Sequence, residues 1–235
     1  MVDVGRAGPE PVRGEDNFTA LKANLEDPVA YFLGEDFEGV CYPDFKSEYY
    51  GFPPSKTYVF ADAEESAVKT TGFSPLLSFA QGGLAQAWTG GVYPFNDSEL
   101  GDFPFRYKDI EPYYNEVAER IGITGVEDDL VRFMPIHENL MNPLTLDEHS
   151  ALLLAKYEEQ KTALNGRLGC YFGRSRIATL AQERDGRQKC SYLGRCLWGC
   201  PSGAFYTPSI TLGECRKFSN FRYLSDWYVR HFKFD

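Results

Sequence analysis

Two glycine pairs, Gly82-Gly83 and Gly90-Gly91, enclose a short and mostly apolar segment at residues 84–89. Glycine has no Cβ, so its backbone can approach a flat ligand closely and can take left-handed dihedral angles. Backbone N–H groups at the start of a helix also bind oxygen atoms and phosphate groups. Tight turns use glycine pairs in the same way, so the stretch alone leaves a ligand-binding turn and a structural turn both open.

The composition predicts a globular protein with a sizeable core. Hydrophobic residues make up 43% of the 235 residues and aromatic residues 15%, enough for one large domain or two small ones. The formal net charge of −10 argues against a surface that follows nucleic-acid phosphates, which needs clustered Lys and Arg. A small or neutral partner is expected instead, and no apolar run reaches the length that spans a membrane.

Cysteine usage bears on the compartment. The chain has six cysteines, and three of them are crowded between Cys190 and Cys200. A small secreted fold spreads its cysteines into a disulfide framework, which this spacing does not resemble. We therefore expect a reducing, cytoplasmic location.

Local patterns predict five elements. Residues 1–5 are typical of the end of a buried strand, because apolar residues flank one acid before a Gly/Pro-rich stretch. Helical spacing of apolar residues predicts helices at about 109–121 and 147–164, each followed by a glycine-containing stop. An Asp-Gly turn at 184–187 predicts a hairpin, and the aromatic run 221–234 predicts one or two strands.

The stretch from Phe79 to Pro94 resembles the segment that runs beneath the isoalloxazine ring in glucose-methanol-choline (GMC) oxidoreductases. The resemblance continues through residues 102–114 and 121–125, which are similar to the helix that follows the flavin loop in that family. It implies an α/β fold: a partial FAD-binding Rossmann-like domain with an inserted α+β substrate-domain region. The implied divisions are residues 1–130 for the FAD-binding part, 131–217 for the substrate-domain-like part with the cysteine loop, and 218–235 for the returning strands.

The same resemblance assigns candidate cofactor contacts. Gly82 and Gly83 would lie against the flavin or pyrophosphate, and the Thr89 hydroxyl would face the reactive edge of the ring. Some relatives tether the flavin through a His where this chain has Ala87, so noncovalent FAD is expected. The full set of candidate cofactor contacts is Asp3, Gly82, Gly83, Ala87, Trp88, Thr89, Gly90 and Val229.

Two of these candidates come from the adenosine side of the fold. Asp3 matches the acid at the end of the second strand, which accepts hydrogen bonds from the ribose. Val229 matches the strand whose backbone meets the adenine. Two of the eight candidates have a plain alternative: Asp3 as a surface acid and Trp88 as an aromatic core residue.

A second motif is Cys190-x5-Cys196-x3-Cys200, followed directly by Pro201. Three thiolates on one glycine-containing loop can converge on an inorganic centre. The loop resembles the iron–sulfur loop in catalytic subunits of bacterial FAD-dependent sugar dehydrogenases of the same family, which implies a three-cysteine iron–sulfur cluster. Zinc would need a distant fourth ligand, such as Cys170 or a His, and three reduced buried cysteines are the remaining alternative.

Parts that the family requires are expected outside this sequence. No Gly-x-Gly-x-x-Gly turn occurs here, so the first strand and the pyrophosphate turn are expected upstream of Met1. The family's catalytic base is expected beyond the last residue, and no catalytic role is assigned to His137, His149 or His231. We therefore expect this chain by itself to bind flavin poorly and to be inactive.

The activity that the resemblance implies is hydride transfer from a carbinol carbon to flavin N5. The substrate would be an alcohol, a polyol or a sugar, and the electron acceptor stays open between oxygen and an external carrier. A function of another class is a metal- or iron–sulfur-binding interaction module derived from a flavoprotein. In that case the Tyr- and Phe-rich residues 31–60 would form the partner surface.

Overall fold

The structure, a computed structural model, describes all residues except 11–13, 38, 40–51, 61–70, 74 and 234–235. It divides into two compact units. The first unit comprises residues 1–89, 191–201 and 207–235, and the second comprises residues 90–190 and 202–206. Residues 38 and 40–51 of the predicted partner surface, with Cys41 among them, lie outside the described residues.

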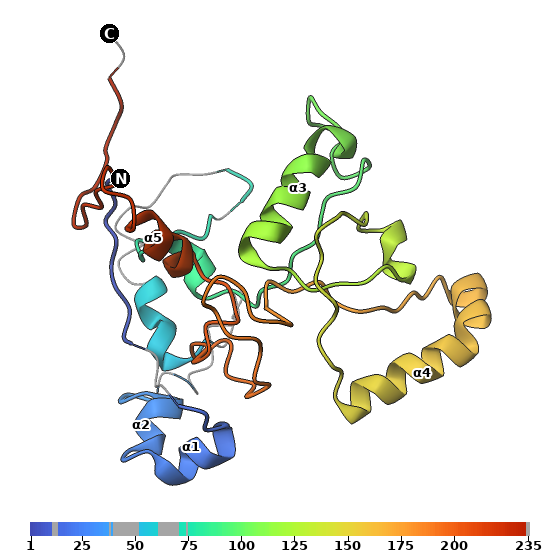
Figure 1. Cartoon of the computed structure of the whole chain (residues 1–235), viewed down its shortest axis with the longest axis horizontal. Helices are drawn as coiled ribbons and strands as arrows, with labels where there is room; N and C mark the ends of the chain where they lie inside the picture. The colour runs from blue at the N-terminus through green and yellow to red at the C-terminus, as the bar shows by residue number, and fades with distance from the viewer. Residues whose placement is uncertain (11–13, 38, 40–51, 61–70, 74, 234–235) are drawn as a thin grey trace. The chain divides into compact units, whose positions relative to one another are not determined.

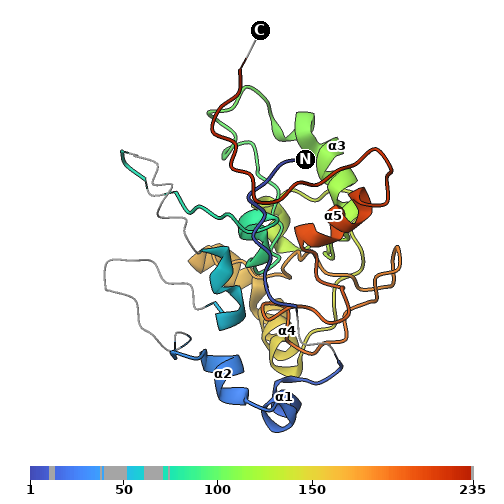
Figure 2. The same ribbon diagram turned by 90° about the vertical axis from the view of Figure 1, so that its left-hand side faces the viewer.

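The described residues of the first unit include three short α-helices and two 3₁₀ turns. They are α1 (Phe18–Asn24), α2 (Pro28–Leu33), η2 (Pro54–Val59), η4 (Gly83–Gln86) and α5 (Pro208–Cys215). Helix α1 begins at Asn17 and α2 begins at Asp27, because these side chains accept hydrogen bonds from backbone N–H groups of the first turn. The two helices lie side by side (Figures 1 and 2).

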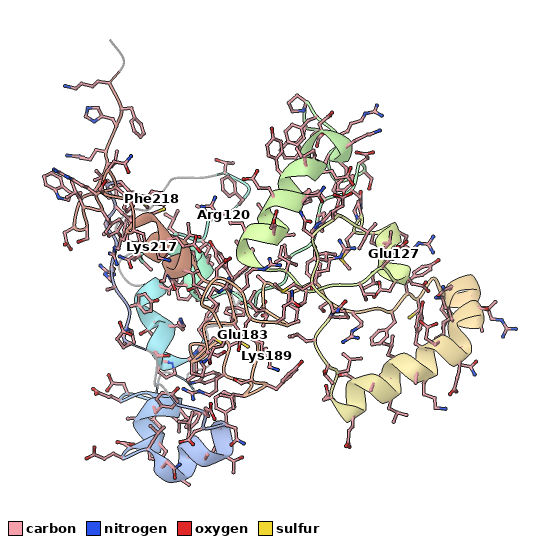
Figure 3. The ribbon with its side chains drawn as sticks, viewed as in Figure 1. Arg120, Glu127, Glu183, Lys189, Lys217 and Phe218 are labelled. Carbon is pink, nitrogen blue, oxygen red and sulfur yellow. The ribbon has the colours of Figure 1, made fainter. Side chains whose placement is uncertain are left out.

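The second unit contains two longer helices and two irregular turns. They are α3 (Tyr107–Ile121), η5 (Asp129–Arg132), α4 (Glu148–Ala163) and a π-helical turn, η6 (Leu164–Leu168). Helix α3 has Arg120 in its last turn, where a cation suits the helix dipole (Figure 3), and it ends at Gly122 with φ +77°. The helices predicted at 109–121 and 147–164 are therefore confirmed, with the second extended by η6.

Backbone pairing in both units consists of isolated bridges. The described residues contain no strand longer than a single bridge. In the first unit residues 1–6 pair in parallel with 222–227 through Val2 and Leu224, and with 79–81 through Arg6 and Ala80. We call these three segments the N-terminal ladder. Met1, Asp3 and Val4 bond residues 222–227, and Arg6 bonds residues 79–81, so residues 1–6 lie in the middle.

The second unit has its own set of paired segments, which we call the central ladder. Residues 176–180 pair with 90–92, 123–125 and 204–206, and Thr124 also bridges Met141. Its side chains form the core of the unit, because Ala178 and Leu180 are fully buried and Ile123 is 1% exposed. The division predicted at residue 130 falls inside this unit, and the predicted domains stay a prediction.

Three local predictions differ in outcome. The turn at 184–187 is confirmed by an antiparallel Arg184–Arg187 bridge, with Asp185 and Gly186 at positive φ. The predicted buried strand end at residues 1–5 is only partly buried, because Gly5 is buried but Val2 is 46% exposed. The C-terminal run 221–234 bridges only at Leu224, so the expected strands are reduced to one pairing in the described residues.

No helix in the described part of the chain combines the length and the apolar character needed to cross a membrane.

Candidate flavin site and cysteine loop

The predicted ribose acceptor, Asp3, lies on the middle segment of the N-terminal ladder. The Tyr223 hydroxyl donates a hydrogen bond of 3.0 Å to Asp3 Oδ2, across 220 positions of sequence. A carboxylate can accept about four hydrogen bonds, so this one leaves room for two ribose hydroxyls. The carboxylate is only partly buried, which keeps it accessible to a ligand.

Gly5 explains why Tyr223 reaches Asp3. Its φ is +62°, and a Cβ at this position would lie 2.1 Å from the Tyr223 hydroxyl oxygen. Burial raises the pKa of Tyr223, contact with Gln81 opposes this, and the Asp3 carboxylate raises the pKa again. The hydroxyl therefore stays protonated and remains a donor to the carboxylate.

The glycines of the first pair play different roles. A Cβ on Gly82 would lie 2.8 Å from both the Gln86 amide nitrogen and Pro208 Cβ, so packing within the unit already requires this glycine. The Gln86 amide donates to the Gln81 carbonyl at 2.7 Å and to the Ser209 hydroxyl at 2.8 Å, which ties the turn to α5. Beside Gly83, by contrast, the space that a Cβ would occupy has no atom within 4 Å. Of these two glycines, Gly83 is the one with open space beside its Cα, where a cofactor could approach.

The following residues are divided between core and surface. Ala87 is 5% exposed and packs in a small core with Val59 and Ala80. Trp88 is half-buried and Thr89 is exposed.

The two remaining candidate contacts are Gly90 and Val229. Gly90 belongs to the second unit, where a Cβ would lie 2.4 Å from the Phe205 ring. Val229, in the first unit, is 49% exposed. The cofactor role of all eight candidates stays a prediction.

The three cysteines of the second motif fall into different units: Cys190 in the second, Cys196 and Cys200 in the first. Cys196 is exposed, whereas Cys190 and Cys200 are partly buried, so three buried cysteines are not what is observed. The searched part of the chain, which leaves out Cys41, holds no group of three metal-ligating side chains. The iron–sulfur and zinc interpretations stay predictions.

Two side chains hold the loop with Cys196 and Cys200 in place. Arg195 is 1% exposed and donates to the backbone carbonyls of Gly14 and Asp16, at 3.2 and 3.0 Å. The Trp198 ring packs edge-on to Phe18 at 5.1 Å between ring centroids. A buried guanidinium must be hydrogen-bonded to offset its lost hydration, so these contacts fix the loop against residues 14–18.

The histidine nearest a polar network is His137, which is 6% exposed and stacks on Tyr114 at 5.9 Å between centroids. Its Nδ1 lies 3.0 Å from the Glu138 carbonyl, and burial lowers its pKa. His137 is therefore a packed, buried histidine of the second unit.

Sequence reasoning missed Tyr223, Gln81 and Arg195 as members of these sites. A tyrosine and a glutamine in aromatic or polar runs carry no pattern that points to a partner far along the chain. Arg195 did carry a signal, because it stands between two cysteines in a predicted ligand loop, where a buried cation has to find backbone acceptors.

Comparison with known proteins adds no family assignment: no protein-family model matches the chain, and no curated protein matches it.

Proposed function

We propose that this chain contributes the adenosine- and flavin-facing part of an FAD-dependent oxidoreductase that oxidises CH–OH groups of an alcohol, a polyol or a sugar. The N-terminal ladder supports this proposal most directly. An extended segment ends in an acid and a left-handed glycine, Asp3 and Gly5, with a parallel neighbour at 222–227. Dinucleotide-binding folds use this arrangement of strand end, acid and parallel neighbour for the ribose.

The flavin-facing side of the proposal rests on the turn at Gly83. Space is open beside its Cα at the start of η4, and the Gly83 N–H donates to the Ala80 carbonyl at 2.8 Å, which fixes the turn. The exposed Thr89 hydroxyl follows a few residues later. Bound flavin supplies a two-electron acceptor for hydride from a carbinol carbon. The chain's own part in this proposal is to bind and orient the cofactor.

The proposal is tested by FAD titration of two proteins: the 235-residue chain, and the same chain extended before Met1 by a strand, a Gly-x-Gly-x-x-Gly turn and a helix. The extended protein is expected to bind FAD and the shorter one to bind it weakly. In the extended protein Asp3→Asn should weaken binding about tenfold, because a charge-assisted hydrogen bond to ribose is lost.

Glu26→Gln is the matched control for Asp3→Asn, since Glu26 is an exposed acid of the same unit. It should leave FAD binding unchanged. The proposal fails if the extended protein binds no FAD, or if Asp3→Asn and Glu26→Gln have equal effects.

A second candidate function is an iron–sulfur- or metal-binding interaction module, favoured by the anchoring of Cys196 and Cys200 through Arg195 and Trp198. Anaerobic reconstitution followed by iron, sulfide and zinc analysis tests it. Metal should be retained by Cys215→Ser and lost in Cys196→Ser and Cys200→Ser. Equal metal content in all three variants would rule this function out.

A further inference from the structure

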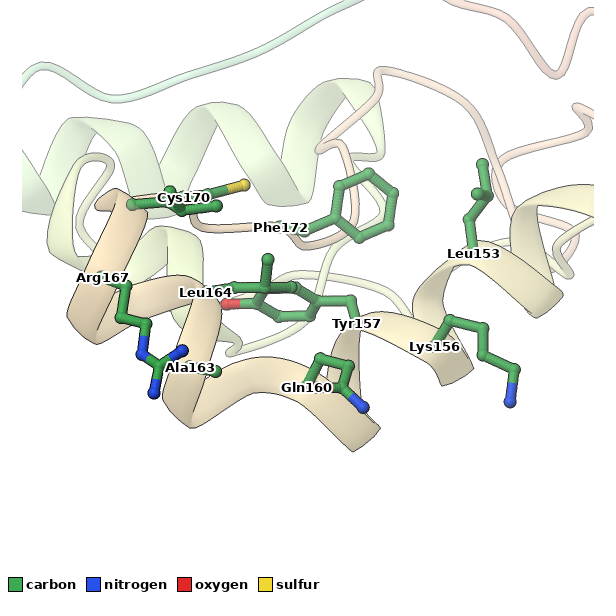
Figure 4. A pocket seen from close by; sticks show the side chains of 10 residues that line it. Leu153, Lys156, Tyr157, Gln160, Ala163, Leu164, Arg167, Cys170 and Phe172 are labelled. Atoms are coloured by element: carbon green, nitrogen blue, oxygen red, sulfur yellow. The ribbon is translucent and has the colours of Figure 1, made fainter.

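Helix α4, the π-helical turn η6 and the returning residues 170–172 enclose a groove of about 660 Å³ within the second unit. This volume lies in the range of small-molecule sites, about 300–1,000 Å³. The groove is built from one continuous segment (Figure 4). We call it the α4 groove. Its lining residues are Leu153, Lys156, Tyr157, Gln160, Ala163, Leu164, Arg167, Leu168, Cys170 and Phe172.

The floor of the groove is fixed without any ligand. Tyr157 is 4% exposed, and its hydroxyl lies 2.6 Å from Asp129 Oδ2 and 2.9 Å from Asn165 Oδ1. Its ring also packs against Phe172, with 5.8 Å between centroids. Lys161 forms an ion pair of 2.7 Å with Asp129. This ion pair holds in position the carboxylate that accepts the hydrogen bond from the Tyr157 hydroxyl. A preformed site loses little conformational entropy on binding.

The walls of the groove expose large apolar side chains. Leu153 is 47% exposed, Leu168 is 73% exposed and Phe172 is 39% exposed. Single exposed apolar residues are ordinary on protein surfaces, but these three line one concavity. A ligand that covers them would therefore gain from removing apolar area from water.

The charged residues that line the groove itself are both cations. Its lining includes Lys156 and Arg167 but no Asp or Glu, although the whole chain carries a formal charge of −10. Lys156 is already paired with Glu159, at 2.7 Å. Arg167, at the other end of the groove in Figure 4, has the planar fork that matches a carboxylate.

We infer that the α4 groove binds an amphipathic anion, an alkyl chain ending in a carboxylate, with the chain over Tyr157 and the head group at Arg167. The site is separate from the proposed flavin function and does not depend on it. The charge of Arg167 disfavours an alkyl cation.

Titration calorimetry of the full chain with decanoate, decanol and decyltrimethylammonium tests this site. Decanoate should bind saturably and at least tenfold more tightly than the cation. Arg167→Gln should weaken decanoate about fivefold and leave decanol unchanged, because only the charged head uses the guanidinium. Lys156→Gln should change decanoate binding less than twofold, since Lys156 already pairs with Glu159.

The apolar walls are tested by two neighbouring leucines of α4. Leu153 lines the groove, whereas Leu152 is 56% exposed outside it. Leu153→Asp should weaken decanoate at least tenfold and Leu152→Asp less than twofold, with helix content by circular dichroism the same in both. Equal effects of the two changes, or preference for the cation, would overturn the inference.

Acidic lipid in a bilayer shares this ligand chemistry, so sedimentation with phosphatidylcholine vesicles containing phosphatidylglycerol is the second arm. Binding of free decanoate without cosedimentation is the expected result. Cosedimentation without saturable binding of decanoate would overturn the assignment to a free amphiphile.

Discussion

The N-terminal ladder and the central ladder have the same kind of backbone, single bridges between extended segments, but their side chains differ. In the central ladder Ala178 and Leu180 are fully buried. In the N-terminal ladder Val2 is 46% exposed, Leu224 49% and Trp227 62%. The first arrangement is a core, and the second is more exposed, with the Asp3 acid only partly buried. Substitutions should therefore cost stability in the central ladder and binding in the N-terminal one.

The largest expected loss of stability is at Arg176, in the central ladder. Its guanidinium is 2% exposed and donates to the Met134 carbonyl at 2.8 Å and to the Pro135 carbonyl. Burial lowers its pKa, and the charges of Asp128 and Tyr107 oppose this. Arg176→Leu leaves two carbonyls without donors, so we expect a loss of about 3 kcal/mol in the free energy of unfolding.

Urea unfolding of Arg176→Leu measures this loss. Arg120→Leu is its control, because Arg120 is an exposed arginine at the end of α3 and should cost less than about 0.5 kcal/mol. Similar losses of unfolding free energy in the two variants would show that the buried arginine of the central ladder contributes no more to stability than an exposed arginine.

The next prediction compares the loss of stability at two glycines. Gly122 and Gly83 both have positive φ, +77° and +62°, but a Cβ on Gly122 would lie 2.2 Å from Leu180 Cδ2, while Gly83 has open space. Gly122→Ala adds overpacking to backbone strain and should cost about 3 kcal/mol. Gly83→Ala adds strain alone and should cost about 1 kcal/mol.

Thermal and urea unfolding measure the stability loss of both glycine variants. FAD titration of the same two variants in the extended protein measures their effect on binding. Gly83→Ala should weaken FAD binding and Gly122→Ala should leave it unchanged in the folded fraction. A larger stability loss at Gly83 than at Gly122 would mean that the turn at Gly83 is a packing turn.

The parts of the fold that sequence could predict are those with local causes. Helix α3 was predictable because apolar residues recur at helical spacing and Gly122 supplies a left-handed end. The Asp185-Gly186 turn followed from residues that tolerate positive φ. Both depend on neighbours a few positions away, so no tertiary information was needed.

The rest depends on contacts that no local pattern encodes. Leu153, Tyr157 and Leu164 recur along one side of α4, yet of these three only Tyr157 is buried, and all three line the α4 groove. Periodicity shows that a helix has an apolar side, but not what covers it. The bond between Tyr223 and Asp3 likewise joins positions 220 apart.

The smallest expected effect concerns the pH dependence of stability at Asp129, below the α4 groove. Hydrogen bonds from Lys161, Tyr157 and Asn165 lower its pKa to about 2, from about 3.9 in an unfolded chain. A depressed folded-state pKa stabilises the protein above the unfolded value, and this contribution is lost as the pH falls from about 4 toward 2. In Asp129→Asn this part of the acid destabilisation should be absent.

Melting temperatures at pH 5 and pH 2 test this sign. The decrease between the two should be smaller in Asp129→Asn than in the wild type. Glu127→Gln, an exposed acid beside η5 (Figure 3), should keep the full decrease. If the melting temperatures of Asp129→Asn and the wild type fall by the same amount, Tyr157 is not held by an ionised carboxylate. The α4 groove would then not owe its preformed shape at neutral pH to the Lys161–Asp129 ion pair.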